Sequence, residues 1–294
     1  YCNANPIFMD VDEYLNIDVK KTINFLRYNT FKKGKFTYNK KTKKKISTLI
    51  LVHVYGNLAD IKPLIKICKE KNIDIIEDAA ESVGSYYKNF KIKKHSGTIG
   101  KFGCLSFNGN KLITTGAGGA ILTQNKNLAA KARYLVNQAK NDPINFVHNE
   151  VGYNYRMSNL HAAVGLAQIE KIKKILNNKK KIYNYYLNSI SKINGLSILK
   201  HPNYCIANHW INLVKINKNI YKKNIKLLIN IFRKNKIEVR PLWLPNHLQK
   251  PFSNCEKFQI NNAQKMMSSF LCLPSSANLK KNQISKIVNL FKQK

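Results

Sequence analysis

The sequence predicts an α/β fold with a mainly parallel sheet flanked by helices, followed by a small C-terminal α+β domain. Residues 48–55 form a continuous apolar run, which is typical of a strand covered on both faces. A helical pattern and a second apolar run at 73–76 follow, and a strand–helix–strand unit of this kind is parallel and right-handed. After residue 193 the pattern changes to short helices and strands. We therefore predict a large domain over residues 1–193 and a small one over 194–294.

The large domain is expected to begin with a strand at 6–10 and a helix at 18–29, for which Asp18 is an N-cap. Residues 32–45 are rich in lysine and broken by glycine, so we interpret them as a solvated loop. Asp60 can begin the helix between the two parallel strands. The other elements expected here are strands at 103–107 and 119–123, a helix at 126–140, and one long helix from Ser158 to residue 190.

The small domain is expected to be a compact unit in which the apolar residues of each element face one core. Its predicted strands lie at 209–216, 237–239 and 270–273. Its predicted helices lie at 221–234, 263–269 and 282–291. No internal repeat connects the two domains.

Cysteine spacing and hydropathy indicate where the protein works. The six cysteines are scattered without a CxxC pair, which argues against a zinc site and a disulfide scaffold. Cys68, Cys104 and Cys272 lie in apolar runs and are expected to be buried. No apolar stretch approaches the roughly 18 residues of a membrane helix, and the first residues lack the basic and apolar regions of a signal peptide. We expect a cytoplasmic protein without a membrane span.

The net charge of +36, from 51 basic and 15 acidic residues, raises the alternative of a nucleic-acid-binding protein. Only five of the basic residues are arginine, so 46 (51 − 5) are lysine. Surfaces that read bases or clamp phosphates rely on arginine for its planar fork. The composition therefore favours lysines at tolerant surface positions, and we expect no specific nucleic-acid partner.

Carboxylates gather where the second parallel strand is expected to end. Glu77, Asp78 and Glu81 stand at its carboxyl end, the edge at which open α/β sheets bind ligands. A carboxylate there can hold a cationic ring nitrogen. Asp78 and Glu81 also fit a capping box at the start of a helix, so both interpretations stay open.

A single lysine lies in a distinctive context. The strand at 103–107 contains Ser106, a loop of small residues then presents Lys111, and a glycine-rich turn follows at 116–119. A hydroxyl and open backbone N–H groups can cradle a phosphate. A lysine partly withdrawn from water can form a Schiff base.

Two other segments carry weaker signals. Residues 152–157 form an aromatic loop with Arg156, which fits a packed turn as well as a site. His53, at the end of an apolar strand, is more consistent with a buried core histidine than with a catalyst. The sequence has no Walker A, HExxH or Gly-x-Ser-x-Gly motif, and no GxGxxG after a strand.

In this order, the motifs resemble those of the DegT/DnrJ/EryC1/StrS family of sugar aminotransferases, along the whole chain. The resemblance implies the type I fold of enzymes that depend on pyridoxal 5′-phosphate (PLP). The wording of the motifs is closest to the 4-aminotransferases of the bacillosamine and legionaminic acid type. The matching runs are VHVYG at 52–56 with Ala59 and Asp60, EDAAES at 77–82, SFNGNK at 106–111, GAGG at 116–119, GYNYR at 152–156 and LPSS at 273–276.

The resemblance also implies roles for individual residues. Lys111 matches the lysine that binds PLP covalently and acts in catalysis, and Asp78 matches the aspartate that pairs with the pyridine nitrogen. Ser106 matches a hydroxyl on the cofactor phosphate. Asn154 matches an asparagine that reaches the phosphate of the neighbouring subunit's cofactor, so a homodimer is implied. Glu81 stands near the ring, where the family often has glutamine or histidine.

The implied activity is transfer of an amino group from an amino acid, with glutamate the expected donor, to a nucleotide-linked 4-keto-6-deoxy sugar. Such amino sugars serve the biosynthesis of surface polysaccharide, lipopolysaccharide or other glycans. Some relatives have histidine instead of the lysine and are dehydratases, and Lys111 argues against that activity. A PLP enzyme that acts on amino acids alone is a further alternative.

The family's chains begin earlier, with a helix, a strand and a Gly-Thr-x-Ala loop that also holds the phosphate. We therefore expect this sequence to be N-terminally incomplete and, with apolar sheet edges exposed, poorly soluble. The main alternative to the active enzyme is a truncated, catalytically inactive remnant of the family.

Overall fold

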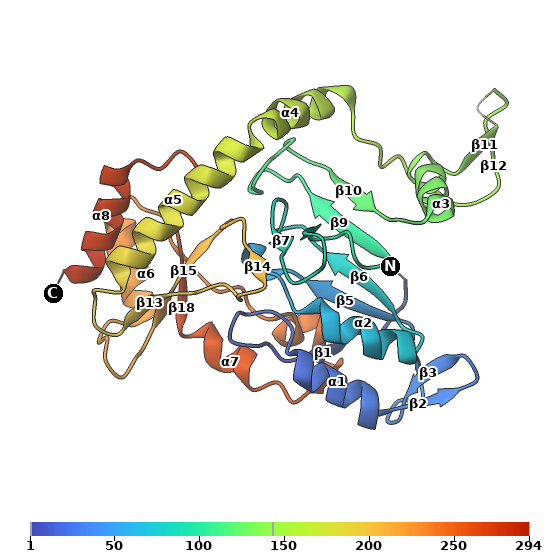
Figure 1. Cartoon of the computed structure of the whole chain (residues 1–294), viewed down its shortest axis with the longest axis horizontal. Helices are drawn as coiled ribbons and strands as arrows, with labels where there is room; N and C mark the ends of the chain where they lie inside the picture. The colour runs from blue at the N-terminus through green and yellow to red at the C-terminus, as the bar shows by residue number, and fades with distance from the viewer. Residues whose placement is uncertain (1, 143, 294) are drawn as a thin grey trace.

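The computed structural model, which describes residues 2–142 and 144–293, is built around a four-stranded sheet in the order β10-β9-β6-β5 (Figure 1). Strands β5, β6 and β9 are parallel, and β10 pairs with β9 in the antiparallel direction. The prediction of a mainly parallel sheet is confirmed. The strands are β5 (Thr48–Val52), β6 (Asp74–Asp78), β9 (Phe102–Ser106) and β10 (Gly119–Leu122).

Helices α1 (Val19–Tyr28) and α2 (Ile61–Glu70) cover one face of this sheet. Leu51 of β5 is fully buried beneath them, whereas Ile50 and Val52 on the other face are 61% and 38% exposed. The expectation that this run is covered on both faces is therefore wrong for the described chain. Successive strand residues point to opposite faces, and only one face has helices packed against it. The strand also ends early, because residues 54–56 form the 3₁₀ turn η1 (Val54–Gly56).

The lysine-rich segment at 32–45 is not a loop, and that prediction is wrong. It belongs to an antiparallel sheet of β2 (Thr30–Lys33), β3 (Phe36–Asn39) and β4 (Lys45–Ile46). Phe31 stacks on Tyr38 across the pair, with ring centres 5.6 Å apart, and Lys45 lies 4.0 Å over the Phe36 ring. Stacked aromatic rings and ammonium groups over ring faces therefore stabilise strands in a segment whose composition suggests a solvated loop.

Helix starts agree with the sequence better than helix ends in the N-terminal part, whereas α6 (Ile225–Lys234) begins four residues after its predicted start and ends as predicted. Asp18 caps α1 by accepting a hydrogen bond from Lys21 N at 2.9 Å, as expected. Asp60 precedes α2, but its side chain makes no capping bond. The long helix expected from Ser158 is two helices, α4 (Asn159–Glu170) and α5 (Ile172–Ile190), and Lys171 ends one and begins the next. Helix α3 (Lys126–Val136) ends before residue 140.

The C-terminal part forms a sheet in the order β13-β15-β18-β16, packed against α5, α6 and α8. Tyr186, Leu228, Phe232 and Leu271 are fully buried in its core. The α+β arrangement is as predicted, although the strand expected at 237–239 lies slightly later. The elements are β13 (Leu196–Ile198), β15 (Asn212–Ile216), α6 (Ile225–Lys234), β16 (Arg240–Pro241), α7 (Asn262–Met267), β18 (Phe270–Leu273) and α8 (Lys281–Lys292).

Two short pairings tie the halves of the chain together. One joins β1 (Ile7–Met9) to β17 (Glu256–Phe258) in parallel, and the other joins β14 (Cys205–Ile206) to β7 (Tyr86–Tyr87), which also pairs with β8 (Lys94–His95). Helix α5 contributes to the core of the C-terminal part, so the boundary at residue 193 stays a prediction. At one corner of the molecule, α3 lies beside the hairpin of β11 (Lys140–Asp142) and β12 (Val147–His148) (Figure 1).

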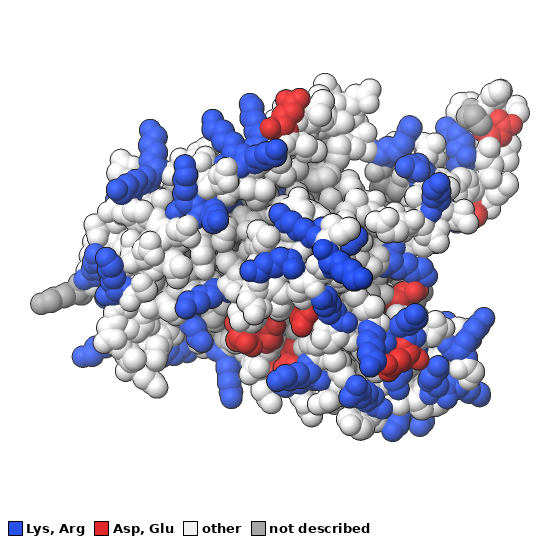
Figure 2. Space-filling view, in the orientation of Figure 1, with Lys and Arg blue, Asp and Glu red and all other residues white. Residues whose placement is uncertain are grey.

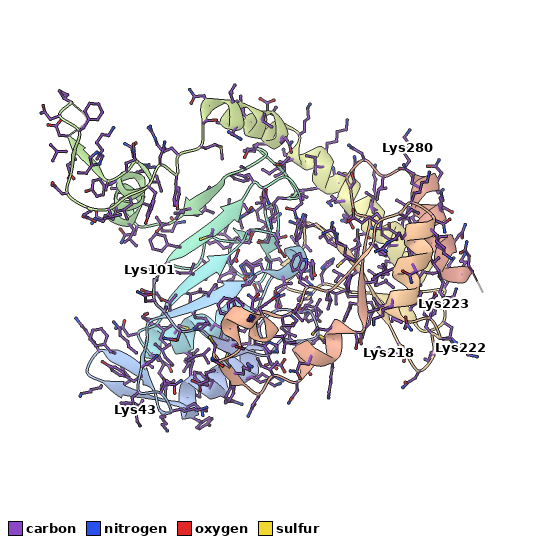
Figure 3. The ribbon with its side chains drawn as sticks, turned by 180° about the vertical axis from the view of Figure 1, so that it is seen from behind. Lys43, Lys101, Lys218, Lys222, Lys223 and Lys280 are labelled. Atoms are coloured by element: carbon purple, nitrogen blue, oxygen red, sulfur yellow. The ribbon has the colours of Figure 1, made fainter. Side chains whose placement is uncertain are left out.

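The positive charge is spread over the surface. Figure 2 shows lysines and arginines over nearly every element of one face, and few acidic side chains among them. Figure 3, from behind, places Lys43, Lys101 and Lys280 on separate parts of the fold, whereas Lys218, Lys222 and Lys223 lie together in the segment before α6. The six cysteines are free; Cys68 and Cys272 are buried as expected, but Cys104 is only half-buried and Cys205 is buried instead. Within residues 2–142 and 144–293, no helix is long and apolar enough to cross a membrane.

A histidine pair, of which His209 is buried and His201 half-buried, joins the two halves. His201 Nδ1 lies 2.8 Å from the side-chain oxygen of Asn57, and His201 Nε2 lies 2.9 Å from His209 Nδ1. Tyr183 of α5 stacks on His209 with ring centres 4.4 Å apart. Burial lowers the pKa of His201 to about 4 and that of His209 to about 3, with nearby positive groups adding to the effect on His209.

This pair predicts a stability loss in weak acid. Because the folded pKa values lie below the ordinary value of about 6.5, protonation favours the unfolded chain, and stability falls as the pH drops from 6.5 towards 4. One such histidine accounts for about 2 kcal/mol between pH 7 and pH 5. Burial raises the pKa of Asp12 and of Glu81 to about 7, so protonation of these two groups stabilises the fold as the pH falls. The contribution of the histidines is therefore measured by comparing a histidine variant with the parent.

The measurement is the free energy of urea unfolding at pH 7 and pH 5 for the parent and His209→Gln. The variant is expected to depend less on pH over this interval than the parent. Equal pH dependence in the two proteins would contradict the assignment.

Candidate active site

Lys111 lies in the loop that follows β9, where its side chain is largely enclosed. The loop is held by bonds from Lys111 N to Asn108 O at 3.0 Å and from the Trp210 indole N–H to Asn110 O at 2.8 Å. The Lys111 side chain is 14% exposed, and its Nζ lies 3.9 Å from Glu81 Oε1. Nζ also lies 4.6 Å from the centre of the Trp210 ring. A single amine is thus presented against one carboxylate and one aromatic face.

Asp78 and Ser106 end neighbouring parallel strands on the same face of the sheet. Asp78 pairs in register with Cys104, and Ser106 stands two residues beyond Cys104, so the three side chains share a face. Asp78 Oδ1 accepts a bond from Ala80 N at 3.1 Å, and its side chain makes no other hydrogen bond within the described part of the chain. The segment after Asp78 consists of turns, so the capping-box interpretation is wrong.

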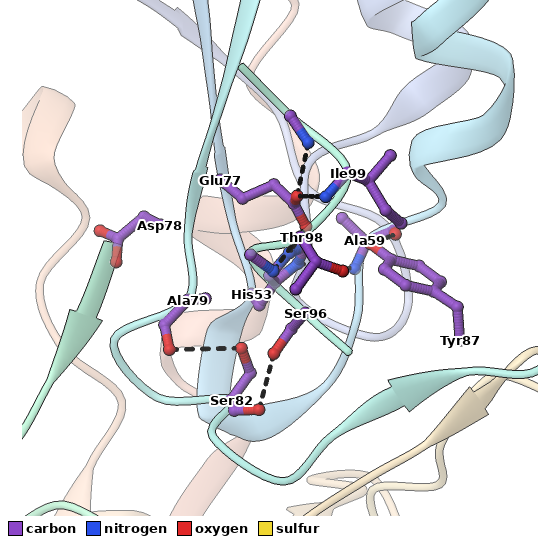
Figure 4. A network of polar contacts seen from close by, with 12 residues as sticks. His53, Ala59, Glu77, Asp78, Ala79, Ser82, Tyr87, Ser96, Thr98 and Ile99 are labelled. Atoms are coloured by element: carbon purple, nitrogen blue, oxygen red, sulfur yellow. Dashed lines mark hydrogen bonds and ion pairs between the residues drawn. The ribbon is translucent and has the colours of Figure 1, made fainter. Parts of the chain in front are cut away.

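Glu77 belongs to the other face and is not a ligand group. Figure 4 shows its side chain on the opposite side of β6 from Asp78. It is fully buried, lies 3.0 Å from His53 Nε2, and accepts bonds from the backbone N–H groups of Ile99, Gly100 and Gly97 at 2.7, 2.7 and 2.9 Å. Burial alone would raise its pKa, but the bonds from His53 and the backbone lower it overall. The expected grouping of three carboxylates therefore reduces to Asp78 and Glu81, and His53 is the core histidine expected.

Glu81 is the carboxylate nearest to Lys111. Its side chain is 12% exposed, and Oε2 accepts a bond from Tyr55 N at 2.6 Å. Tyr55 sits in the η1 turn with a φ of 57°, so this bond also fixes a strained backbone. Burial raises the pKa of Glu81 to about 7, against the opposing effects of the Tyr55 N–H and Lys111. The carboxyl group can therefore change its protonation state near neutral pH.

A cavity of about 980 Å³ opens beside Lys111. Its walls come from the Lys111 loop, α4 and α5, the residues just before β15, the β16 region, and the end of β18 with the segment after it. Trp210 and Trp243 line it, and Trp243 stacks on Tyr55 with ring centres 4.6 Å apart. This volume is at the upper end of the range typical of small-molecule sites.

Asn154 lies apart from these residues. It is exposed, forms an isolated bridge with Asn137, and does not line the cavity. The following helix α4 is exposed along apolar positions, including Leu160 at 82% and Leu166 at 61%. Within one chain, then, Asn154 is not assembled with Lys111, and its role towards a second subunit stays a prediction.

The sequence interpretation missed the two tryptophans and one lysine of the cavity. Trp210 and Trp243 are the only tryptophans in the chain, and that rarity was an available signal. Lys179, in contrast, is one of 46 lysines and carried no signal of its own.

The groups at the sheet edge fit PLP. The cofactor's aldehyde requires an amine, and that of Lys111 is nearly enclosed. Its ring nitrogen requires a carboxylate, and Asp78 has an oxygen not bonded to other described residues. Its phosphate requires a donor, and the Ser106 hydroxyl lies on the same sheet face as Asp78. Gly109, in the loop before Lys111, has open space where a Cβ would lie, so the backbone there is accessible.

Comparison with known proteins identifies the family of the chain. The model of the DegT/DnrJ/EryC1/StrS aminotransferase family matches residues 1–292. The chain is 31% identical over 247 residues to EpsN of Bacillus subtilis, which is assigned as a pyridoxal phosphate-dependent aminotransferase. The match covers 83% of this chain but only 62% of EpsN. It is 29% identical over 296 residues to the GDP-perosamine synthase of Caulobacter vibrioides, covering 100% of this chain and 74% of that protein.

The fold is shared with solved members of the same family. A crystal structure of a DegT DnrJ EryC1 StrS aminotransferase from Brucella abortus superposes with a TM-score of 0.84 at 20% identity, covering 98% of this chain and 73% of that one. The predicted type I fold is thereby confirmed. From its motifs, its fold and the match over nearly all its residues, the chain belongs to the DegT/DnrJ/EryC1/StrS aminotransferase family.

Proposed function

We propose that the protein is a PLP-dependent aminotransferase that moves an amino group from glutamate to a nucleotide-linked 4-keto-6-deoxy sugar. The observation that carries the proposal is the enclosed amine of Lys111 beside Glu81 and Trp210, in the wall of a cavity large enough for such a substrate. Family membership supports the reaction type, and the perosamine synthase relative supports the substrate class.

Four residues are proposed to hold the cofactor. Lys111 binds it covalently, Asp78 keeps its ring nitrogen protonated, Ser106 contacts its phosphate, and Glu81 lies near the ring. PLP, when bound, supplies an electron sink for the bond that breaks at the donor's α-carbon. The negative charge of Asp78 stabilises the proton on the ring nitrogen, which is what makes the sink effective.

Lys111 is also the proposed general base. Once its amine is released by the incoming amino group, Lys111 Nζ accepts the proton from the donor's α-carbon. Trp210 limits the water that reaches this amine, and Glu81 supplies a neighbouring carboxyl group that titrates near pH 7. In the second half of the reaction, the same groups act in reverse order on the keto sugar.

The homodimer and the location in the cytoplasm are part of the proposal. Exposed apolar side chains on α4 support a subunit contact at which Asn154 would reach the other subunit's cofactor phosphate. The free cysteines support a reducing compartment. The product would serve surface polysaccharide, lipopolysaccharide or glycan biosynthesis.

The test is an absorbance spectrum with added PLP, followed by a coupled assay. We expect a visible band that borohydride removes, and formation of 2-oxoglutarate from L-glutamate when a 4-keto-6-deoxy sugar linked to GDP, dTDP or UDP is present. Turnover with keto acids only would indicate an amino-acid aminotransferase. No band would favour the inactive remnant, and retention on any polynucleotide without PLP uptake would favour a polyanion-binding protein.

A further inference from the structure

Lys179, in the middle of α5, is buried to an extent that lysine rarely reaches. The residue is 6% exposed, and of the lysines in residues 2–142 and 144–293 it alone is buried. Its Nζ donates to Trp210 O at 2.6 Å and to Ser275 O, in the segment after β18. An ammonium group has three donors, so one remains beyond these two carbonyl oxygens.

This charge has no counter-ion among the residues that the structure describes. Throughout the described part of the chain, no carboxylate lies within 4.0 Å of Lys179 Nζ. Burial lowers its pKa to about 8, so the group is still mostly cationic at neutral pH. A buried cation without a partner is costly, and two carbonyl oxygens could equally be bridged by a neutral donor. A role as a structural tether alone therefore does not explain the choice of lysine.

Lys179 lines the same cavity as Lys111, and Trp210 lies between the two amines. The Trp210 ring faces Lys111 at 4.6 Å, while its carbonyl oxygen accepts the bond from Lys179. Ser275, the other acceptor, belongs to the run at 273–276 that carries part of the family resemblance and has no assigned task. The buried charge is thus one residue away from the proposed reaction centre.

The charged groups around Lys179 leave the cavity positive. Lys171 and Lys174 line it from the same helical segment, and Lys111 lines it from the facing loop. Its one lining acid, Glu238, already bonds Arg240 Nε at 2.8 Å. His209, on the far side of Lys179, has its pKa lowered to about 3 by burial and by neighbouring positive groups, so it is neutral at pH 7.

We propose that Lys179 binds an anionic oxygen of a substrate, a carboxylate or a phosphate, in the cavity beside Lys111. The inference rests on the proposed function for the class of substrate. A carboxylate would come from the amino-acid donor, and a phosphate from the nucleotide. In either case the remaining donor of Lys179 forms a charge-assisted bond, and burial makes this bond stronger than the same bond to an exposed lysine.

The experiment compares Lys179→Met, Lys179→Arg and the control Lys173→Met, which removes an exposed lysine of α5 that does not line the cavity. Each PLP-treated protein is titrated calorimetrically with L-glutamate and, separately, with UDP, GDP and dTDP. Lys179→Met is expected to weaken binding of one class of probe about 10- to 100-fold, as for loss of one charged hydrogen bond. Lys179→Arg should retain most of the affinity, and Lys173→Met all of it. The probe that responds identifies the source of the anion.

A pH series separates ligand binding from a structural role. In the parent, affinity for the responsive probe should fall as the pH rises from 7 to 9, because Lys179 loses its proton. The fall should be absent in Lys179→Met and in Lys179→Arg, where arginine stays charged. Thermal unfolding of each variant shows whether it is folded.

Unchanged binding of both probe classes by Lys179→Met, equal weakening in Lys179→Arg, or no probe binding by the parent would overturn the proposal. Failure of the proposed function is seen separately, as the absence of a borohydride-sensitive band, and leaves the nucleoside diphosphate titration interpretable.

Discussion

Replacing Lys111 with alanine is expected to abolish the borohydride-sensitive absorbance band and to lower transamination turnover by at least about 10³-fold. Lys111 is the enclosed amine at the sheet edge, with Nζ 3.9 Å from Glu81 and 4.6 Å from the Trp210 ring centre. The variant removes both the covalent attachment of the cofactor and the group that accepts the α-proton. No nearby described residue can supply both.

The matched control is Lys101→Ala, on the surface at 44% side-chain exposure, where the lysine pairs with Asp74 at 2.6 Å. It should keep both the band and the turnover. Mass spectrometry after borohydride reduction should place the cofactor on the peptide that contains Lys111. An unchanged band in Lys111→Ala, or the label on another lysine, would contradict the assignment.

Replacing Glu77 with alanine is expected to lower the free energy of unfolding by about 3–5 kcal/mol, the cost of breaking a buried charged network. The variant leaves His53 and the N–H groups of Ile99, Gly100 and Gly97 without their acceptor in a fully buried place. An unpaired buried donor loses its bond with water and gains nothing in exchange. The loop at 97–100 should therefore detach first.

Urea unfolding at pH 7 measures this loss, with Glu70→Ala, which removes an exposed carboxylate of α2, as the control. Because the folded pKa of Glu77 is lowered, its contribution is present above the ordinary value of about 4.5 and disappears as the pH falls below it. Hydrogen exchange should show faster exchange at 97–100 in Glu77→Ala. Equal unfolding midpoints for parent and variant would refute the structural role.

Neighbouring residues show how far a sequence pattern reaches. Glu77 and Asp78 are adjacent, and the pattern placed both at the end of a parallel strand. A strand alternates its side chains, so Asp78 faces the open side while Glu77 is buried against the loop at 97–100. Which of the two faces is open depends on the helices that cover the sheet, and a single strand does not specify this.

The errors in the predicted elements have similar causes. The segment at 32–45 looked like a loop because its lysines were counted as charges. In the structure, the ammonium groups of Lys43 and Lys45 lie over the rings of Phe31 and Phe36, and Phe31 stacks on Tyr38 across a small sheet. The break between α4 and α5 at Lys171 was not predicted, because neither proline nor glycine stands at that position. In both places packing between elements outweighed local propensity.

The sequence by itself determined the parallel sheet, the order of its strands, and the placing of Lys111 between a strand end and a glycine-rich turn, because these depend on short runs of neighbouring residues. Only the tertiary structure brought Trp210 to Asn110 and Lys111 across 100 residues of chain, and placed Lys179 Nζ against the Trp210 carbonyl oxygen. Contacts of this kind depend on how the two halves of the chain pack. Whether a given lysine is solvated or buried without a counter-ion is therefore decided by that packing and not by its immediate neighbours in the sequence.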